Sequence, residues 1–305
     1  MILDIKFPAP RRVNTQATLA LEASRETETF HARLRLRPPI GVYNLSLATV
    51  IGHFDRCIDE IGELPPMNDR STQASAKRNE FLATLDGLLD ALMEHIDDCN
   101  SVLKCFFKDE KSTEYKEIYN AFKSEIRPYR DRVGKIVNKI KHEQGRLRLV
   151  HSDSVLGTSF GYYVEGVDLN GVIGPDPDIH HPRGETAYSL GRDFRLHVNG
   201  IFFVAARLAH AIYRATGKGV VTSLPENASL ANLVKRVGDI PPIFFPDEIS
   251  QPFPTVKITD TICRVSVGFG NFEKAKSPPG AKISVSFVGD GVSRSFRIPY
   301  IGKNN

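Results

Sequence analysis

The sequence predicts an α+β protein in which an antiparallel helical bundle lies between an N-terminal β-hairpin and a C-terminal mixed domain with antiparallel strands. Three observations lead to this prediction. Two short runs near the N-terminus alternate apolar and polar residues, the middle of the chain carries apolar residues at helical spacing, and Gly, Pro, Asp and Asn become more frequent after Val150. We therefore divide the 305 residues into segments 1–40, 41–150 and 151–305.

The first segment is expected to form the hairpin. Residues 18–23 and 30–37 alternate with period two and flank the polar stretch 24–27. In the second run a row of cationic side chains shares one face, and such rows often protect an edge strand from aggregation. The row consists of His31, Arg33, Arg35 and Arg37. This hairpin could pair with the terminal sheet, which would intertwine the two outer segments.

The middle segment carries apolar stripes spaced by three and four residues, as in amphipathic helices that pack as an antiparallel bundle. The stripes cover residues 47–61, 82–96, 115–126 and 129–140. The second stripe lies in a helix expected over 71–100. Pro128 is expected to begin a new helix, because a proline in the first turn loses no hydrogen bond.

The last segment is expected to be mixed. Residues 160–174 predict a hairpin that turns at Asn170-Gly171, a dipeptide favoured in type I′ turns. Residues 194–215 predict one helix, closed by Gly217. Three strands are expected after it, at 262–269, 282–288 and 293–300, with the tight connection 289–291 between the last two.

The segment 127–148 accounts for the positive charge of the chain. It holds eight basic and two acidic residues, whereas the whole chain has a net charge of +4. On one helix, five of its side chains would fall within about 80° of one another, on the flank of the apolar stripe. These are Arg132, Lys135, Lys139, His142 and Arg146. With Arg148 beyond them, such cations could follow a phosphate backbone. The alternative is the ordinary charged flank of a surface helix.

Residues 134–142, Gly-Lys-Ile-Val-Asn-Lys-Ile-Lys-His, resemble the terminal helix of HEPN-like domains. These are small helical bundles that often dimerise, and many act as metal-independent RNases in toxin–antitoxin, CRISPR and phage-defence systems. Their catalytic signature is an Arg, four to six residues, then a His, with a polar residue commonly after the Arg. His142 matches the His, but Lys135 is the only basic residue at the positions for the Arg. The resemblance therefore implies His142 as a general base with Lys135 beside it, although Lys lacks the bidentate clamp of an Arg.

Two other clusters are expected to be ordinary surface features. Residues 176–185 combine carboxylates with the adjacent His180 and His181, which could not easily converge on one metal ion, so we expect a polar loop. Arg192, Arg195 and His197 begin the later helix and are expected to be solvated. The chain contains no P-loop, GxGxxG, GxSxG or HExxH motif, and we predict neither a cofactor nor a metal.

Three functions agree with these patterns. The first is binding of RNA or another polyanion, or RNA cleavage, by a HEPN-like protein in a stress, toxin–antitoxin or phage-defence system. The second is a non-enzymatic assembly or partner-binding subunit of a larger complex, with a protein partner or a second copy of the chain bound through the bundle. The third is an enzyme for a small anionic substrate. The patterns leave open whether the protein is an enzyme, and the missing Arg favours binding over catalysis. Because the chain lacks a long apolar run and a secretory signal pattern, we expect a cytoplasmic protein with no membrane partner.

Overall fold

The computed structural model describes residues 3–8, 13–154, 157–180, 186–221, 224–248, 253–258, 262–268, 282–285 and 295–300. In this part of the chain the helices are α1 (Gln16–Ala23), α2 (Pro39–Gly62), α3 (Thr72–Lys104), α4 (Thr113–His142), α5 (Leu190–Thr216) and α6 (Ala228–Asp239), with two short 3-10 helices, η1 (His31–Leu34) and η2 (Pro246–Glu248). The strands are β1 (Leu3–Pro8), β2 (Arg146–Ser154), β3 (Gly157–Val167), β4 (Ile173–Pro175), β5 (Tyr188–Ser189), β6 (Phe253–Ile258), β7 (Ile262–Gly268) and β8 (Lys282–Val285). The predicted α+β class is confirmed.

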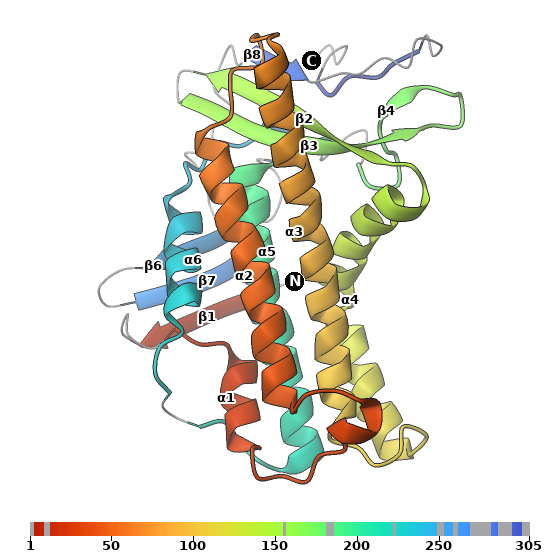
Figure 1. Ribbon diagram of the computed structural model, residues 1–305, viewed down its shortest axis with the longest axis vertical. Helices are drawn as coiled ribbons and strands as arrows, with labels where there is room; N and C mark the ends of the chain where they lie inside the picture. The colour runs from red at the N-terminus through yellow and green to blue at the C-terminus, as the bar shows by residue number, and fades with distance from the viewer. Residues whose placement is uncertain are drawn as a thin grey trace.

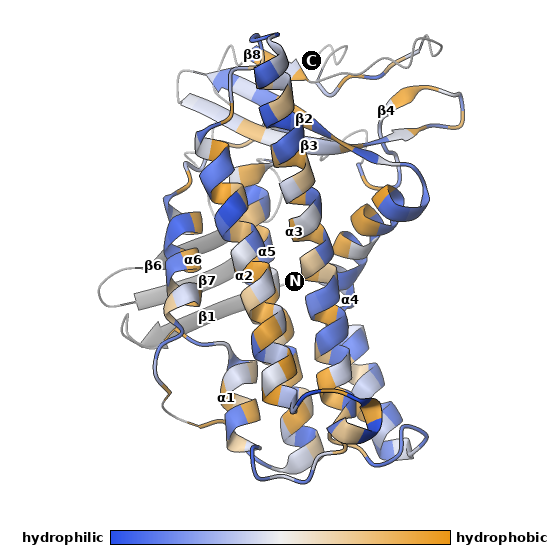
Figure 2. Cartoon of the chain, in the orientation of Figure 1, coloured by the Kyte–Doolittle hydropathy of each residue, from blue (hydrophilic) through white to orange (hydrophobic). Residues whose placement is uncertain are grey.

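The long helices form one bundle with a continuous core. Figure 1 shows α2 and α3 side by side, α4 next to α3, and α5 behind them. Hydrophilic and hydrophobic segments alternate along α2, α3 and α4, as expected for amphipathic helices (Figure 2). A single hydrophobic cluster extends from Val13 on the N-terminal side to Val237 in α6 and includes most of the inward side of α5. Helix α5 therefore belongs to the same core as the helices that precede it.

Helix α5 is the central element of this core. By length and composition it could cross a membrane, but 72% of its most apolar 18-residue window is buried inside the protein. Along its length, α5 contacts α1, α3, α4 and α6 as well as strands of both sheets. This burial is consistent with the core helix of a soluble protein.

Two antiparallel sheets cover the bundle. The first has the strand order β1-β7-β6, with Leu3 opposite Val267, and it packs on α5 and α6. The second has the order β4-β3-β2-β8, with β5 paired to β3, and lies across one end of the helices (Figure 1). The N-terminus thus pairs with a C-terminal strand, as the sequence suggested, but through residues 3–8.

The predicted N-terminal hairpin is wrong. Its first half is helix α1, and its second half contains only the 3-10 helix η1. The side chain of Thr15 accepts a hydrogen bond from the backbone of Thr18 and so caps α1. Ala17, Ala20 and Leu21 then share a buried helical face that packs against α5. A short run of small apolar residues fits both the two-residue period of a strand and the 3.6-residue period of a helix. Here the helix forms because it buries Ala17, Ala20 and Leu21 on one face.

The predicted helices of the bundle are confirmed, with one correction at Pro128. Ser71 caps α3 as its expected start implies, but Pro128 lies inside the single helix α4 instead of beginning a new one. Pro128 has no N–H to donate to the carbonyl of Ser124, four residues earlier in the helix. Both residues are exposed, so water can donate a hydrogen bond to the carbonyl of Ser124. The buried face, which includes Ile126 and Tyr129, continues across the proline.

The expectations for the last segment are mostly confirmed. Strands β3 and β4 form the hairpin around Asn170-Gly171, although only Gly171 has a positive φ and Asp168 accepts hydrogen bonds from the backbone of Asn170 and Val172. Gly217 closes α5 in the left-handed conformation. Strands β7 and β8 lie where expected, whereas residues 295–300 contribute only an isolated bridge between Phe296 and Ile173. The connection 289–291 lies outside the described residues.

Helices α4 and α5 approach closely at Gly200. A Cβ atom built on Gly200 would lie 2.1 Å from Cζ of Tyr129, well inside van der Waals contact. Tyr129 is itself buried between the helices and cannot turn outward without leaving the core. The absence of a side chain at residue 200 is therefore a condition of this helix packing.

We predict that Gly200→Ala lowers the free energy of unfolding by about 1–3 kcal/mol, because the added methyl group overpacks the interface with Tyr129. Gly52→Ala in α2 is the matched control, since no atom lies within 4 Å of its Cβ position. The control should leave stability unchanged or raise it by up to about 1 kcal/mol. Denaturant unfolding of both variants tests this, and equal stability of Gly200→Ala and wild type would contradict the packing argument.

A polar contact is buried between α2 and α3. Oγ of Ser46 lies 2.9 Å from Nδ1 of His95, and Nε2 of His95 lies 3.9 Å from Sγ of Cys99. Burial lowers the pKa of His95 to about 4, so the imidazole is neutral in the folded protein at neutral pH. His95 is thus a neutral core group that connects the two helices.

This burial predicts a pH dependence of stability. Because the folded pKa of His95 is about 4 and an unfolded histidine titrates near 6.5, its contribution is complete above about pH 6.5 and is lost as the pH falls towards 4. The loss amounts to at most about 1.4 kcal/mol per pH unit. His95→Gln should reduce this slope in denaturant unfolding measured from about pH 6.5 to pH 4.5. An unchanged slope would show that folding does not lower the pKa of His95.

Candidate functional site

Helix α4 ends before the predicted basic stripe does. His142 is its last residue, Gln144 has a positive φ of 59°, and the backbone of Gly145 donates to the carbonyl of Lys139. The chain then enters β2, which carries Arg146 and Arg148. The prediction that Arg146 continues the helical stripe is therefore wrong, since the left-handed turn breaks the helix.

Three of the predicted nucleic-acid-binding cations form ion pairs with carboxylates of the protein itself. Nη2 of Arg132 lies 3.0 Å from Oδ1 of Asp193. Nζ of Lys139 lies 2.8 Å from Asp176 and 2.9 Å from Glu143. The guanidinium of Arg148 contacts both oxygens of Glu165, at 2.7 and 2.8 Å. These side chains are 20%, 17% and 10% exposed, so little of their charge faces solvent.

The other predicted site residues face solvent. Lys135, His142 and Arg146 are exposed, and none of them forms an ion pair within the described part of the chain. Asn138, also exposed, lies one helical turn before His142 on the same face. We call these four residues the α4 basic surface. The structure thus brings the predicted catalytic pair, Lys135 and His142, onto one face of α4.

A buried polar network lies on the inner side of the same helix. Asp193, near the start of α5, accepts hydrogen bonds from Arg132 and from Oη of Tyr162, which lies 2.7 Å from its Oδ2. Nε2 of His197 lies 3.1 Å from the same oxygen, and Oη of Tyr129 lies 3.1 Å from Nδ1 of His197. Burial alone would raise the pKa of Asp193, but His197, Arg132 and Tyr162 hold it well below its usual range. The network therefore contains a buried carboxylate that stays ionised.

A second buried carboxylate joins the start of α5 to the segment after α6. Glu248 accepts hydrogen bonds from the backbone of Ser189 and Phe245, and its Oε1 lies 3.8 Å from Arg192. Burial raises the pKa of Glu248 to about 7 despite these favourable contacts.

The guanidinium of Arg195, also at the start of α5, donates to the carbonyls of Gly191, Gly238 and Ile240. The prediction that Arg192, Arg195 and His197 are solvated is wrong, because each has partners in the interior.

The Arg-to-His spacing of the HEPN-like signature, absent from the end of α4, occurs in α5. Arg192 is followed by Asp193 and, after four intervening residues, by His197. Inspection of the spacing along the whole chain would have found it, and would also have found Arg146 with His151 and Arg25 with His31, so the spacing by itself is not specific. Arg192 and His197 are 4% and 1% exposed, which closes this pair to RNA in the present fold.

The predicted polar loop at 176–185 is also partly buried. Asp176 holds Lys139, and Nε2 of His180 accepts a hydrogen bond from the backbone of Val164. Both residues are at most 2% exposed, which corrects the expectation of a surface loop for residues 176–180. Residues 181–185 lie outside the described chain.

The predicted cationic strand face of residues 31–37 is not present, because this segment contains a 3-10 helix and no strand. Arg33 there donates to the carbonyl of Phe107.

Comparison of the chain with models of known protein families, with curated proteins and with solved structures finds no match. Among the described residues, no group of three His, Cys, Asp or Glu side chains is arranged to hold a metal ion. The geometry of the two sides of α4 is therefore the basis for a functional argument.

We predict that Asp193→Asn lowers the free energy of unfolding by about 2–4 kcal/mol, because it leaves the guanidinium of Arg132 without its buried counterion. Asp131→Asn is the matched control, since it removes the acidic partner of an exposed ion pair with Arg127 on the same helix. That loss should cost about 0.5 kcal/mol or less. Thermal or denaturant unfolding measures both, and equal effects of the two variants would show that the Asp193 network does not stabilise the fold.

Proposed function

We propose that the protein binds RNA or another polyanion through the α4 basic surface, as a cytoplasmic HEPN-like protein of a stress, toxin–antitoxin or phage-defence system. The observation that carries the proposal is the division of cations along α4 and the start of β2. Arg132 and Lys139 are neutralised from inside, whereas Lys135 and Arg146 are exposed without ion-pair partners in the described chain, and His142 is exposed as well. Cations that are not used by the protein remain available to phosphates.

The position of these residues favours binding over cleavage. Lys135 and His142 are separated by two turns, so their Cα atoms lie roughly 10 Å apart along the helix axis. This spacing allows the two side chains to contact different phosphates of one strand. Lys also provides a point charge and not the fork of a guanidinium. The cytoplasmic assignment agrees with Cys57, Cys99 and Cys105, which are buried free thiols.

We expect the double variant Lys135→Gln/Arg146→Gln to bind a single-stranded RNA oligonucleotide more weakly than wild type. The slope of log K against log salt should become shallower by about 0.7 per lost phosphate contact. Lys116→Gln/Lys123→Gln is the matched control, since it removes two exposed cations from the other half of α4. Fluorescence anisotropy at several salt concentrations measures both. An unchanged slope in the first variant, or no RNA binding by the wild type, would contradict the proposal.

The same protein samples decide between binding and cleavage. Wild type incubated with the RNA in the presence of a chelator should leave the oligonucleotide intact over hours, as judged by denaturing gel electrophoresis. Cleavage by wild type that is lost in His142→Ala, with RNA binding retained, would instead assign His142 as a general base. That result would replace the binding proposal with the RNase function.

A partner-binding subunit is the second candidate function, and one observation favours it. Leu169 at the tip of the β3–β4 hairpin is fully exposed, and Val167 beside it is 60% exposed. Exposed apolar side chains on a projecting hairpin are suited to contact with another protein or a second copy of this chain. Failure of the wild type to bind RNA would favour this function over the first.

A further inference from the structure

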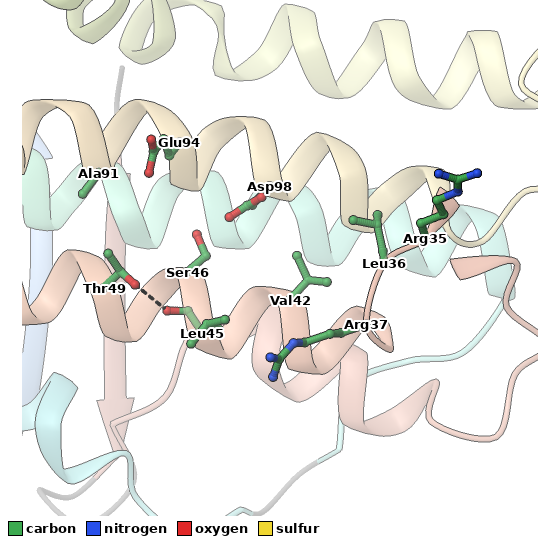
Figure 3. Close-up of a pocket in the computed structure, with 10 residues that line it drawn as sticks. All are labelled: Arg35, Leu36, Arg37, Val42, Leu45, Ser46, Thr49, Ala91, Glu94 and Asp98. Atoms are coloured by element: carbon green, nitrogen blue, oxygen red, sulfur yellow. Dashed lines mark hydrogen bonds between the residues drawn. The ribbon is translucent and has the colours of Figure 1, made fainter. Parts of the chain in front are cut away.

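A groove lies between α2 and α3, beside the N-terminal half of α2 and the stretch 91–98 of α3 (Figure 3). Its volume is about 320 Å³, at the lower end of the range for small-molecule pockets. Apolar side chains from both helices and from the segment before α2 form its middle part, where Leu45 is 56% exposed. These apolar residues are Leu36, Val42, Leu45 and Ala91.

The cationic end of the groove comes from a fixed segment. Arg35 has a positive φ of 56°, a left-handed conformation that costs an L-residue roughly 1–2 kcal/mol. The segment is held by hydrogen bonds from the backbone of Leu36 to the carbonyl of His31 and between the His31 ring and the carbonyl of Leu36. Arg35 and Arg37 both line the groove, and neither forms an ion pair in the described chain. Figure 3 shows Arg37 extending along α2 towards Leu45, whereas the guanidinium of Arg35 is directed away from the other lining side chains. The segment thus presents the guanidinium of Arg37 at the groove.

The opposite side of the groove is rich in hydrogen-bond acceptors. Glu94 and Asp98 lie one turn apart on α3 and form no ion pair within the described residues. The hydroxyl of Thr49 donates to the carbonyl of Leu45, which leaves only its lone pairs for a ligand. Burial raises the pKa of Asp98, and a hydrogen bond from Ser46 opposes that rise. This wall offers two carboxylates and few free donors, so its complement is a group with several N–H donors.

We propose that the groove binds a small zwitterion of the amino-acid or dipeptide class. The ammonium group would contact Glu94 and Asp98, and the carboxylate would contact Arg37, whose guanidinium fork matches a carboxylate. The apolar side chains of the ligand would cover Leu45 and its neighbours. The volume of about 320 Å³ limits the ligand to a small molecule. This site shares no residue with the α4 basic surface and does not depend on RNA binding.

The test uses three forms of one dipeptide. The probes are leucyl-leucine, its N-acetyl derivative, which keeps only the carboxylate, and its C-terminal amide, which keeps only the ammonium group. Isothermal titration calorimetry with the full chain should show that the zwitterion binds at least about tenfold more tightly than either blocked form. No detectable binding of leucyl-leucine at about 10 mM, or equal binding of all three forms, would overturn the proposal.

Two variants assign the ends of the ligand. Arg37→Gln should weaken binding of leucyl-leucine and of the N-acetyl form by about tenfold and leave the amide unaffected. Asp98→Asn should weaken binding of leucyl-leucine and of the amide and leave the N-acetyl form unaffected. Lys135→Gln on α4, which does not line the groove, is the control and should change none of the three. If both groove variants bind all three forms as the wild type does, the groove is not the binding site.

Discussion

Asp193 and Arg132 join α4 to α5, the helix that also contacts α1, α3 and α6, in the interior of the protein. The carboxylate of Asp193 also accepts hydrogen bonds from Tyr162 on β3 and lies against His197, so one buried charge connects two helices and a strand. Removal of either member of a buried ion pair leaves an uncompensated charge, which is far more costly than the loss of a surface pair. A few residues along α5, Gly200 permits the close approach of Tyr129. Together these contacts fix how α4 and α5 pack.

This packing decides which charges remain on the surface. Arg132 and Lys139 are seven residues apart and therefore lie on almost the same face of α4. Their partners, Asp193 and Asp176, hold that face inward. Lys135, Asn138 and His142 lie further around the helix and face solvent as a consequence. The α4 basic surface is therefore a product of the buried ion pairs, and disruption of those pairs would also displace it.

The two proposed sites differ in the charges that they present. The α4 basic surface presents cations, which suits a polyanion of no particular length. The groove between α2 and α3 presents a guanidinium and carboxylates around an apolar middle part, which suits a small molecule with both charges. Because the two sites share no residue, each can be altered by substitution while the other serves as an internal control.

By itself the sequence determined the features that depend on neighbours along the chain. The three- and four-residue spacings gave the helices of the bundle, Ser71 and Gly217 gave helix ends, and Asn170-Gly171 gave the hairpin turn. Helix α1 was missed because its short apolar run fits both a strand and a helix, and only packing against α5 selects between them. The tertiary structure alone decided that Arg192, Arg195 and His197 are buried and that Arg132 and Lys139 face inward. The physical reason is that the partners come from distant segments. Arg132 and Asp193 are 61 positions apart, and such an ion pair leaves no periodic pattern in the sequence.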